Sequence, residues 1–333
     1  MAAESQSLEK WIHPPLRGCY FLTGPTASGK TQLALSLAEK LNAEIISLDS
    51  MAIYKGMDIG TAKPTASEQQ AVPHHLIDIL EPTEAYSVSN FVVDAHRVAE
   101  EIRNRGKRVL VCGGTPLFLK SLLRGLFLGP EADWDFRESV EADLAKYGEE
   151  ALLQRLEQVD PLLAAKLHPH DHRRIIRALE VAKITGRPLS HLQQQFENPA
   201  PNSEVAIAKL EINRAWLHER INSRVESMLE NGLLSETAGL LDTHGELGRT
   251  AAQAVGYKEC ILHLRQGMPL KEMEESIKAH TRQFARRQEI WFRGLDECEL
   301  VETAPESEFD ELLKRIWDFF ESANVDVGEH EKS

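Results

Sequence analysis

Cysteine is scarce in this sequence of 333 residues: there are four, Cys19, Cys112, Cys260 and Cys298, far apart and without a C-x-x-C pair. That spacing excludes a disulfide framework and a zinc finger, and Cys19 and Cys112 fall in apolar runs typical of buried strands. No run of about 18 apolar residues is present, so we expect no membrane partner. The N-terminal stretch lacks the basic start and apolar segment of a secretory signal peptide. We therefore expect a cytoplasmic protein, and a monomeric one.

Basic residues are outnumbered by acidic ones, and the formal net charge is −14. Taken alone, this charge argues against a nucleic-acid partner, but the charges are unevenly distributed. Residues 299–333 hold eleven Asp and Glu against three Lys and Arg. Residues 166–187 hold six basic against two acidic residues, and residues 278–293 hold five against one. Because binding to a polyanion depends on local basic surfaces, these two segments keep a nucleic-acid partner open.

Short apolar runs alternate with helical patterns in the first part of the chain. Runs at 19–22, 44–48, 76–79 and 108–112 predict buried parallel strands, with helices at 32–41, 88–105 and 116–126. This alternation predicts an α/β fold, with a P-loop nucleotide-kinase-like parallel sheet flanked by helices and ligands at the carboxyl ends of the strands. We expect five parts: a disordered lead (1–17), the P-loop α/β core (18–130), a helical insertion (131–200), a return to the core through a strand at 205–212 followed by a helical C-terminal part (201–298), and an acidic tail (299–333), disordered at its end.

The most informative motif is GPTASGKT, which lies between an apolar run and a helix-forming stretch. This is the G-x-x-x-x-G-K-T pattern in the strand–loop–helix context that a P-loop needs. Backbone N–H groups would surround phosphate oxygens, Lys30 would place a charge on the outer phosphates, and Thr31 would ligate Mg²⁺. A turn that only joins strand to helix would not require Lys-Thr there. The motif predicts Mg²⁺ as a cofactor and a loop that binds a diphosphate or triphosphate, made of Gly24, Pro25, Thr26, Ala27, Ser28, Gly29, Lys30 and Thr31.

Two further strand ends carry polar residues. The second predicted strand ends at Asp49, and we expect this strand to lie next to the P-loop strand. Asp49 would then contact a nucleophile as general base or orienting acceptor, although a turn-forming Asp is an equally good interpretation. The fourth strand runs into Gly113, Gly114 and Thr115. A tight turn explains the glycines, and a backbone close to a ligand explains them equally well.

Histidines and arginines gather in the basic segments. His168, His170 and His172 could suggest a metal site, but Arg173 and Arg174 would repel a cation, so we favour hydrogen bonding to a polyanion. The segments 173–177 and 282–293 are either solvated helical faces or surfaces for phosphates and unstacked bases, because arginines are interleaved with apolar residues in both and with aromatic residues in the second. Arg220 and Arg224 share one helix face and could neutralise a leaving phosphate or form surface ion pairs.

Taken together, these stretches resemble the tRNA dimethylallyltransferase family, also called tRNA isopentenyladenosine synthase, of the bacterial type. In this family the P-loop grips the diphosphate of dimethylallyl diphosphate instead of serving phosphoryl transfer. The resemblance implies that the exocyclic N6 amine of a tRNA adenosine, 3′-adjacent to the anticodon, attacks C1 of the dimethylallyl group and releases pyrophosphate. It is carried by GPTASGKT (24–31), DSMAIYKGMDIGTAKPT (49–65), PHHLID (73–78), YSVSNF (86–91), GGTPLFLK (113–120), RRIIRALEV (173–181), AVGYKE (254–259) and TRQFARRQEIWFR (281–293).

The resemblance also implies site residues. Asp49 would accept or orient the amine proton, and Lys30, Mg²⁺ at Thr31 and an arginine, for which we choose Arg220, would stabilise the departing diphosphate. The helical insertion would close over the anticodon loop. The implied tRNA contacts are Asp49, Ser50, Met51, Ala52, Thr115, Arg137, Arg173, Arg174, Ile175, Ile176, Arg177, Gln253, Ala254, Val255, Gly256, Tyr257, Lys258, Ala285, Arg286, Arg287, Gln288, Glu289, Ile290, Trp291 and Phe292.

The sequence departs from the family pattern at some positions. Ala52 stands where many members have Gln, and Phe118 replaces a common Tyr, so an amide and a hydroxyl are missing. Two other functions stay open from the residues alone. One is an ATP-dependent P-loop small-molecule kinase with 173–177 as a phosphate-clamping lid, and the other is a nucleotide-gated RNA-binding module without catalysis.

Overall fold

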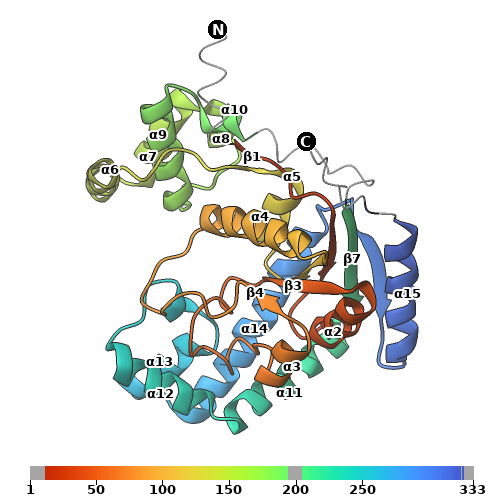
Figure 1. Cartoon of the computed structure of the whole chain (residues 1–333). Helices are drawn as coiled ribbons and strands as arrows, with labels where there is room; N and C mark the ends of the chain where they lie inside the picture. The colour runs from red at the N-terminus through yellow and green to blue at the C-terminus, as the bar shows by residue number, and fades with distance from the viewer. Residues whose placement is uncertain (1–11, 194–204, 324, 326–333) are drawn as a thin grey trace. The chain divides into compact units, whose positions relative to one another are not determined.

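The structure, a computed structural model, describes residues 12–193, 205–323 and 325, and it divides into two compact units (Figure 1). The smaller unit consists of Met1–Pro15 with Arg124–Asn198, and the larger one of Leu16–Leu123 with Pro199–Ser333. The expected boundaries differ from this division. The insertion begins at Arg124 instead of residue 131, and the N-terminal stretch groups with it. Most of the expected disordered lead (1–11) and the end of the chain (326–333) lie outside the described residues.

The larger unit is built on a six-stranded sheet in the order β4-β3-β5-β2-β7-β8, in which every neighbouring pair is parallel. This confirms the α/β fold class. The sheet consists of strands β2 (Cys19–Thr23), β3 (Ala43–Leu48), β4 (His74–His75), β5 (Arg108–Gly113), β7 (Val205–Ile212) and β8 (Glu299–Thr303).

Helices cover both faces of this sheet, so that its central strands are almost entirely buried. On one face, α2 (Lys30–Leu41) and α15 (Phe309–Ser322) share a hydrophobic core with alternate residues of β2, such as Tyr20 and Leu22. Helix α4 (Val88–Asn104) contacts β3 and β5, and its Phe91 stacks on Phe118 of α5 (Pro116–Arg124). The remaining helices of the unit are α3 (Ala66–Ala71), α11 (Arg214–Glu230), α12 (Leu233–His244), the 3₁₀ turn η2 (Ala251–Gln253), α13 (Tyr257–Gln266) and α14 (Leu270–Phe292).

Two predicted elements are wrong. The expected strand at 76–79 is a bent segment after the short strand β4, because Leu76 and Asp78 have φ values of 59° and 54°, which no strand residue adopts. The acidic region 299–333 is not a separate tail in its described part. It supplies edge strand β8 and helix α15, whose Phe320 is fully buried against the sheet. The sequence pattern predicts a helix at 308–322, which α15 confirms, and the acidic residues occupy the solvent side of this amphipathic helix.

The smaller unit is helical. Its helices are α6 (Trp134–Tyr147), α7 (Glu149–Val159), α8 (Pro161–Ala164), α9 (His172–Thr185) and α10 (Leu189–Leu192), packed around a core that includes Val140, Leu156 and Ile175. Strand β1 (Ile12–His13) pairs antiparallel with β6 (Leu126–Phe127). Within the described residues, no helix of either unit is long and apolar enough to cross a bilayer.

Candidate active site

The predicted P-loop forms the turn between β2 and α2. Gly24, Ala27 and Gly29 have φ values of 151°, 62° and 94°; glycine adopts a positive φ readily, and Ala27 adopts one although its Cβ disfavours it. A Cβ on Gly24 would approach the Leu210 carbonyl oxygen to 3.0 Å. The loop leads directly into the N-terminus of α2, where unpaired N–H groups and the helix dipole favour an anion.

Lys30, the first residue of α2, folds back over this loop. Its Nζ donates to the Pro25 carbonyl oxygen at 2.6 Å and to Ser28 Oγ at 3.2 Å. Burial lowers the pKa of Lys30 to about 8, and the positive charge of Arg224 contributes to the shift, while Cys112 and Asp49 oppose it. An anion in the loop would stabilise the charged form. Thr31 is exposed at the same helix start, which leaves its hydroxyl accessible to a ligand.

The loop opens into a cleft of about 630 Å³, entirely within the larger unit. Thr26 to Gln32 form one wall, the 49–64 segment and the end of β5 form others, and α11 and α14 complete it. Its lining joins two carboxylates (Asp49 and Glu219), two aromatic rings (Trp216 and Phe284) and four cationic groups (Lys30, Lys63, Arg220 and Arg224). A charged phosphate-binding end and apolar surface therefore occur in one cavity.

Asp49 lines this cleft, but its strand does not lie next to β2. The expected adjacency is wrong, because β5 lies between β3 and β2 in the sheet. Asp49 Oδ1 accepts the backbone N–H groups of Met51 at 2.7 Å and Ala52 at 3.2 Å. The turn interpretation and the functional one are thus compatible: two backbone donors orient the carboxylate, and Oδ2 makes no hydrogen bond to any residue that the structure describes.

The two glycines after β5 are required by close packing. A Cβ on Gly113 would lie 2.3 Å from the Leu48 carbonyl oxygen, and one on Gly114 would lie 2.7 Å from Gln288 Nε2. Thr115 Oγ1 accepts the backbone N–H of Ser50 at 3.2 Å, so Thr115 connects this turn to the Asp49 segment. Steric contact, and not only turn geometry, explains the glycine pair.

Gln288 of α14 is a site residue whose role the sequence did not indicate. Its side chain accepts the backbone N–H of Thr26 at 2.8 Å and donates to the Gly114 carbonyl oxygen at 2.6 Å. Gln288 is 3% exposed. It therefore fixes the P-loop to the β5 turn, in a position where we had predicted a tRNA contact.

Two arginines of α11 reach the P-loop side of the cleft. Arg220 Nε donates to the Ala27 carbonyl oxygen at 2.6 Å, and its guanidinium lies 5.0 Å from the centre of the Trp216 ring. Arg224 lines the same cleft, and burial lowers its pKa; Asp49 opposes this shift and Arg220 reinforces it. The sequence placed both arginines on one helix face, and the structure gives both access to a ligand in the cleft.

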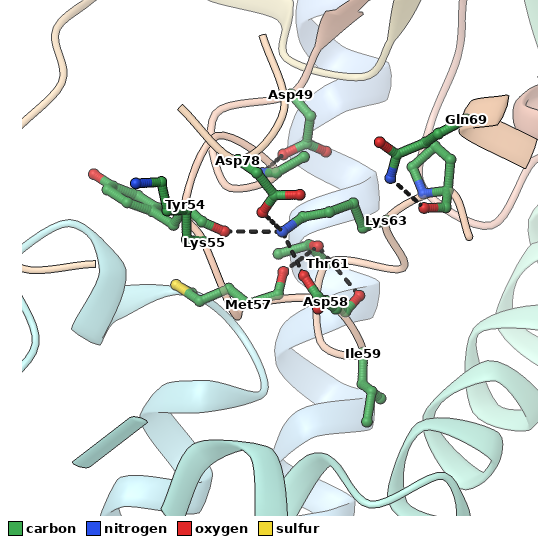
Figure 2. A network of polar contacts seen from close by, with 12 residues as sticks. Asp49, Tyr54, Lys55, Met57, Asp58, Ile59, Thr61, Lys63, Gln69 and Asp78 are labelled. Atoms are coloured by element: carbon green, nitrogen blue, oxygen red, sulfur yellow. Dashed lines mark hydrogen bonds and ion pairs between the residues drawn. The ribbon is translucent and has the colours of Figure 1, made fainter. Parts of the chain in front are cut away.

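The 49–64 segment that carries Asp49 is held by Lys63 (Figure 2). The Lys63 side chain is 3% exposed, and its Nζ donates to the Tyr54 carbonyl oxygen at 2.9 Å and to Asp58 and Asp78 at 2.5 Å each. All three ammonium hydrogens thus have acceptors. This network joins Tyr54 and Asp58 of the segment to Asp78, which follows β4, and Lys63 is a structural residue that sequence reasoning did not single out.

The predicted tRNA segment 253–258 packs onto this same region. The Tyr257 hydroxyl donates to Glu236 at 2.6 Å and accepts the Gly60 N–H at 3.2 Å, and the Glu236 carboxylate also accepts the Ile59 N–H at 2.9 Å. Tyr257 and Ala254 are buried, whereas Gln253 and Lys258 are exposed. Only the latter two side chains are freely accessible to a large ligand.

On α14, the predicted contacts divide by helix face. Ala285 and Phe292 are buried like Gln288, and Glu289 is half-buried. Arg286, Arg287, Ile290 and Trp291 are exposed, with Trp291 at 47%. A solvent-facing surface that combines arginines with an indole ring suits nucleic acid, and tRNA contact there stays a prediction.

In the smaller unit, Ile175 and Ile176 belong to the hydrophobic core, and Arg173 and Arg174 are exposed. Arg137 and Arg177 both bind the fully buried Glu180, at 2.8 Å and 2.5 Å, and Arg177 also donates to the Pro130 carbonyl oxygen at 3.0 Å. Their guanidinium groups stabilise this unit internally. Contact of these residues with tRNA stays a prediction.

The sheet, the loop and the cleft define a P-loop α/β protein with a cationic anion cradle facing an oriented carboxylate. Comparison with known proteins identifies the family. The sequence model of the IPP transferase family matches residues 52–295. A tRNA dimethylallyltransferase of Rhodopirellula baltica is 48% identical over 83% of this chain and 85% of its own length.

Solved structures of similar fold come from the same family of enzymes. The full-length tRNA isopentenylpyrophosphate transferase of Bacillus halodurans is 38% identical, with a TM-score of 0.69 over 93% of this chain and 98% of the other. A eukaryotic dimethylallyltransferase acting on tRNA has a TM-score of 0.74 at 28% identity, over 89% and 76% of the two chains. The chain belongs to the tRNA dimethylallyltransferase family, and it is an enzyme of the prenyltransferase type.

Proposed function

We propose that this enzyme transfers the dimethylallyl group from dimethylallyl diphosphate to the N6 amine of the adenosine 3′-adjacent to the anticodon of tRNA. The observation that carries the proposal is the single cleft that joins the P-loop, Asp49, two arginines and apolar surface. A phosphoryl-transfer enzyme also needs the loop. The family relationship, however, favours transfer of a prenyl group over the kinase alternative.

In the proposed reaction, a bond forms between the adenosine N6 and C1 of the donor while the bond between C1 and the diphosphate oxygen breaks. Asp49 Oδ2 accepts or orients the proton that the amine loses, because Oδ1 is engaged by two backbone donors. The electron pair leaves with pyrophosphate. The loop N–H groups, Lys30, Arg220 and Arg224 stabilise this developing negative charge.

Mg²⁺ suits the oxygen-rich end of the cleft. The exposed Thr31 hydroxyl at the start of α2 and the diphosphate oxygens are hard donors of the kind that Mg²⁺ prefers. When bound, the ion would neutralise charge on the diphosphate. The donor's apolar chain would lie against apolar surface of the lining, to which Trp216 and Phe284 contribute.

The target adenosine must leave the anticodon stack to reach this cleft, at a cost of a few kcal/mol. The exposed face of α14 with Arg286, Arg287 and Trp291 and the exposed residues Gln253 and Lys258 supply charge and a stacking surface for the RNA. The monomeric state and the cytoplasmic location that we expect from the sequence stay predictions.

The decisive experiment incubates tRNA with the protein, dimethylallyl diphosphate and Mg²⁺, without ATP. Mass analysis of digested nucleosides should reveal dimethylallyl adenosine and free pyrophosphate. Unchanged nucleosides, or transfer of a terminal phosphate from ATP, would contradict the proposal.

Asp49→Asn tests the role of the carboxylate. The amide keeps an oxygen that can accept the Met51 N–H but removes the proton acceptor, so turnover should fall by about 10²–10⁴-fold with little change in tRNA affinity. Turnover within a few-fold of the unmodified enzyme would show that Asp49 serves only the turn. Asp242→Asn, which makes the same change at an exposed position of α12 that does not line the cleft, is the matched control.

A further inference from the structure

Outside the cleft, the smaller unit brings together one carboxylate at the start of α7 and two imidazoles at and just before the start of α9. Glu149 is the first residue of α7, His172 is the first residue of α9, and His170 precedes α9 by two residues. One ligand atom from each of the three lies within 4.8 Å of the other two. The sequence motif showed the histidines but could not show Glu149 beside them.

The three side chains converge through the carboxylate. Glu149 Oε1 lies 2.7 Å from His172 Nε2, and Glu149 Oε2 faces His170 Nδ1. Around a tetrahedral ion with bonds of about 2.0–2.1 Å, ligand atoms lie roughly 3.3 Å apart. Small rotations of these partly exposed side chains would bring all three donors to one ion.

His168 supports this arrangement without joining it. Its ring lies 4.8 Å from that of His170, and its Nδ1 accepts the backbone N–H of His170 at 3.3 Å. The ring therefore packs against a donor ring and fixes the backbone at the point where the His170 side chain emerges. Such outer contacts orient metal ligands in known sites.

The surrounding charges repel a cation less than the sequence suggested. We had disfavoured a metal because Arg173 and Arg174 follow the histidines, but Arg174 forms an ion pair with Asp171 at 3.3 Å. Glu149 adds a negative charge within the cluster, and Glu150 is its exposed neighbour. One guanidinium is thus offset locally, and the carboxylate lies between the two imidazoles.

We propose that Glu149, His170 and His172 form a binding site for a borderline first-row divalent cation of the Zn²⁺ class. Two imidazoles and one carboxylate are a donor set that zinc takes with three protein ligands, water completing the coordination. The ion would link the N-termini of α7 and α9 and so stabilise the smaller unit. This site is separate from the proposed Mg²⁺ position, whose donors are all oxygen.

The test is zinc titration of the untagged, full-length protein by calorimetry, in excess Mg²⁺ so that oxygen sites are saturated. We expect one Zn²⁺ per chain, a higher Tm with zinc, and visible absorption on replacement by Co²⁺. His170→Asn combined with His172→Asn should weaken zinc binding by more than about 100-fold, because even loss of an outer contact costs about 10–100-fold. His191→Asn, an exposed histidine of the same unit, is the matched control and should bind as before.

Glu149→Gln guards against a folding defect, since it keeps hydrogen bonding to the histidines and removes only the charged ligand. Circular dichroism reports whether each variant is folded, and zinc binding lost in a folded Glu149→Gln variant supports the site. Binding that is the same in the double variant and the unmodified protein would mean an adventitious ion only and would overturn the proposal, as would absence of binding by the unmodified protein. Prenyl transfer is assayed separately with Mg²⁺, so failure of that activity leaves the zinc result intact.

Discussion

Gln288 offers the sharpest test of how the active site is held together. Gln288→Leu keeps the size of the side chain and removes both hydrogen bonds, to the Thr26 N–H and to the Gly114 carbonyl oxygen. A buried polar group left without a partner costs about 1–3 kcal/mol. Both backbone groups line the cleft, where water can reach them, so we expect the lower end of the sum, a loss of about 2 kcal/mol in the free energy of unfolding.

The same substitution should change donor binding more than tRNA binding. Thr26 belongs to the loop that we assign to the diphosphate, so loss of its hydrogen bond to Gln288 should displace the loop. If this displacement reduces the binding free energy of the donor by about 1.4 kcal/mol, the affinity for the donor falls tenfold. We therefore expect the KM for dimethylallyl diphosphate to rise about tenfold while the Kd for tRNA stays within about twofold.

Two assays decide the matter: denaturant-induced unfolding, and initial rates at varied donor concentration. Gln283→Leu is the matched control, because it makes the same change at an exposed position of the same helix. The reasoning is refuted if both variants unfold at the same denaturant concentration with the same donor KM. A selective loss of tRNA affinity in Gln288→Leu would instead restore the contact predicted from the sequence.

Three further perturbations test other parts of the structure. Lys30 is charged below its pKa of about 8, so the affinity for the donor should decline as pH rises through that value, by up to about tenfold per pH unit. A donor KM that stays constant up to pH 9.5 would contradict this. Gly113→Ala should destabilise the protein by more than about 3 kcal/mol in denaturant unfolding, because the new Cβ would lie 2.3 Å from the Leu48 carbonyl oxygen. Gly148→Ala is the control and should destabilise the protein less, because its Cβ would meet no atom within 4 Å, although the φ of Gly148 is positive. Burial raises the pKa of Glu180, but hydrogen bonds from Arg137 and Arg177 lower it below its ordinary value overall. Its ionised form therefore stabilises the smaller unit fully above the pKa of an unfolded Glu, and this stabilisation is lost as pH falls from there through the lower pKa of the folded state. Glu180→Gln should cost about 3–5 kcal/mol at pH 7 and reduce the acid dependence of Tm, and an unchanged acid dependence would exclude this role.

Local sequence determined the elements whose cause is local. GPTASGKT forms the expected loop between strand and helix, because its glycines permit the required φ values and the flanking residues have strand and helix patterns. The motifs spread over 24–293 were sufficient to identify the family. The boundaries of β7 follow from its apolar run and were predicted to the residue. By contrast, the strand expected at 76–79 was wrong, since an apolar run does not reveal positive φ values.

Only the tertiary structure decided which distant residues meet. Gln288 reaches the P-loop from α14, β5 separates β3 from β2, and Glu149 lies beside two histidines at and just before the start of α9. The described part of the acidic region adds edge strand β8 to the sheet and packs helix α15 against it, and neither the strand nor this packing was expected from the sequence. These outcomes depend on long-range packing and on strand order, which bring together residues far apart in the chain. Periodicity and motif spacing act over a few residues along the chain and carry no information about such contacts.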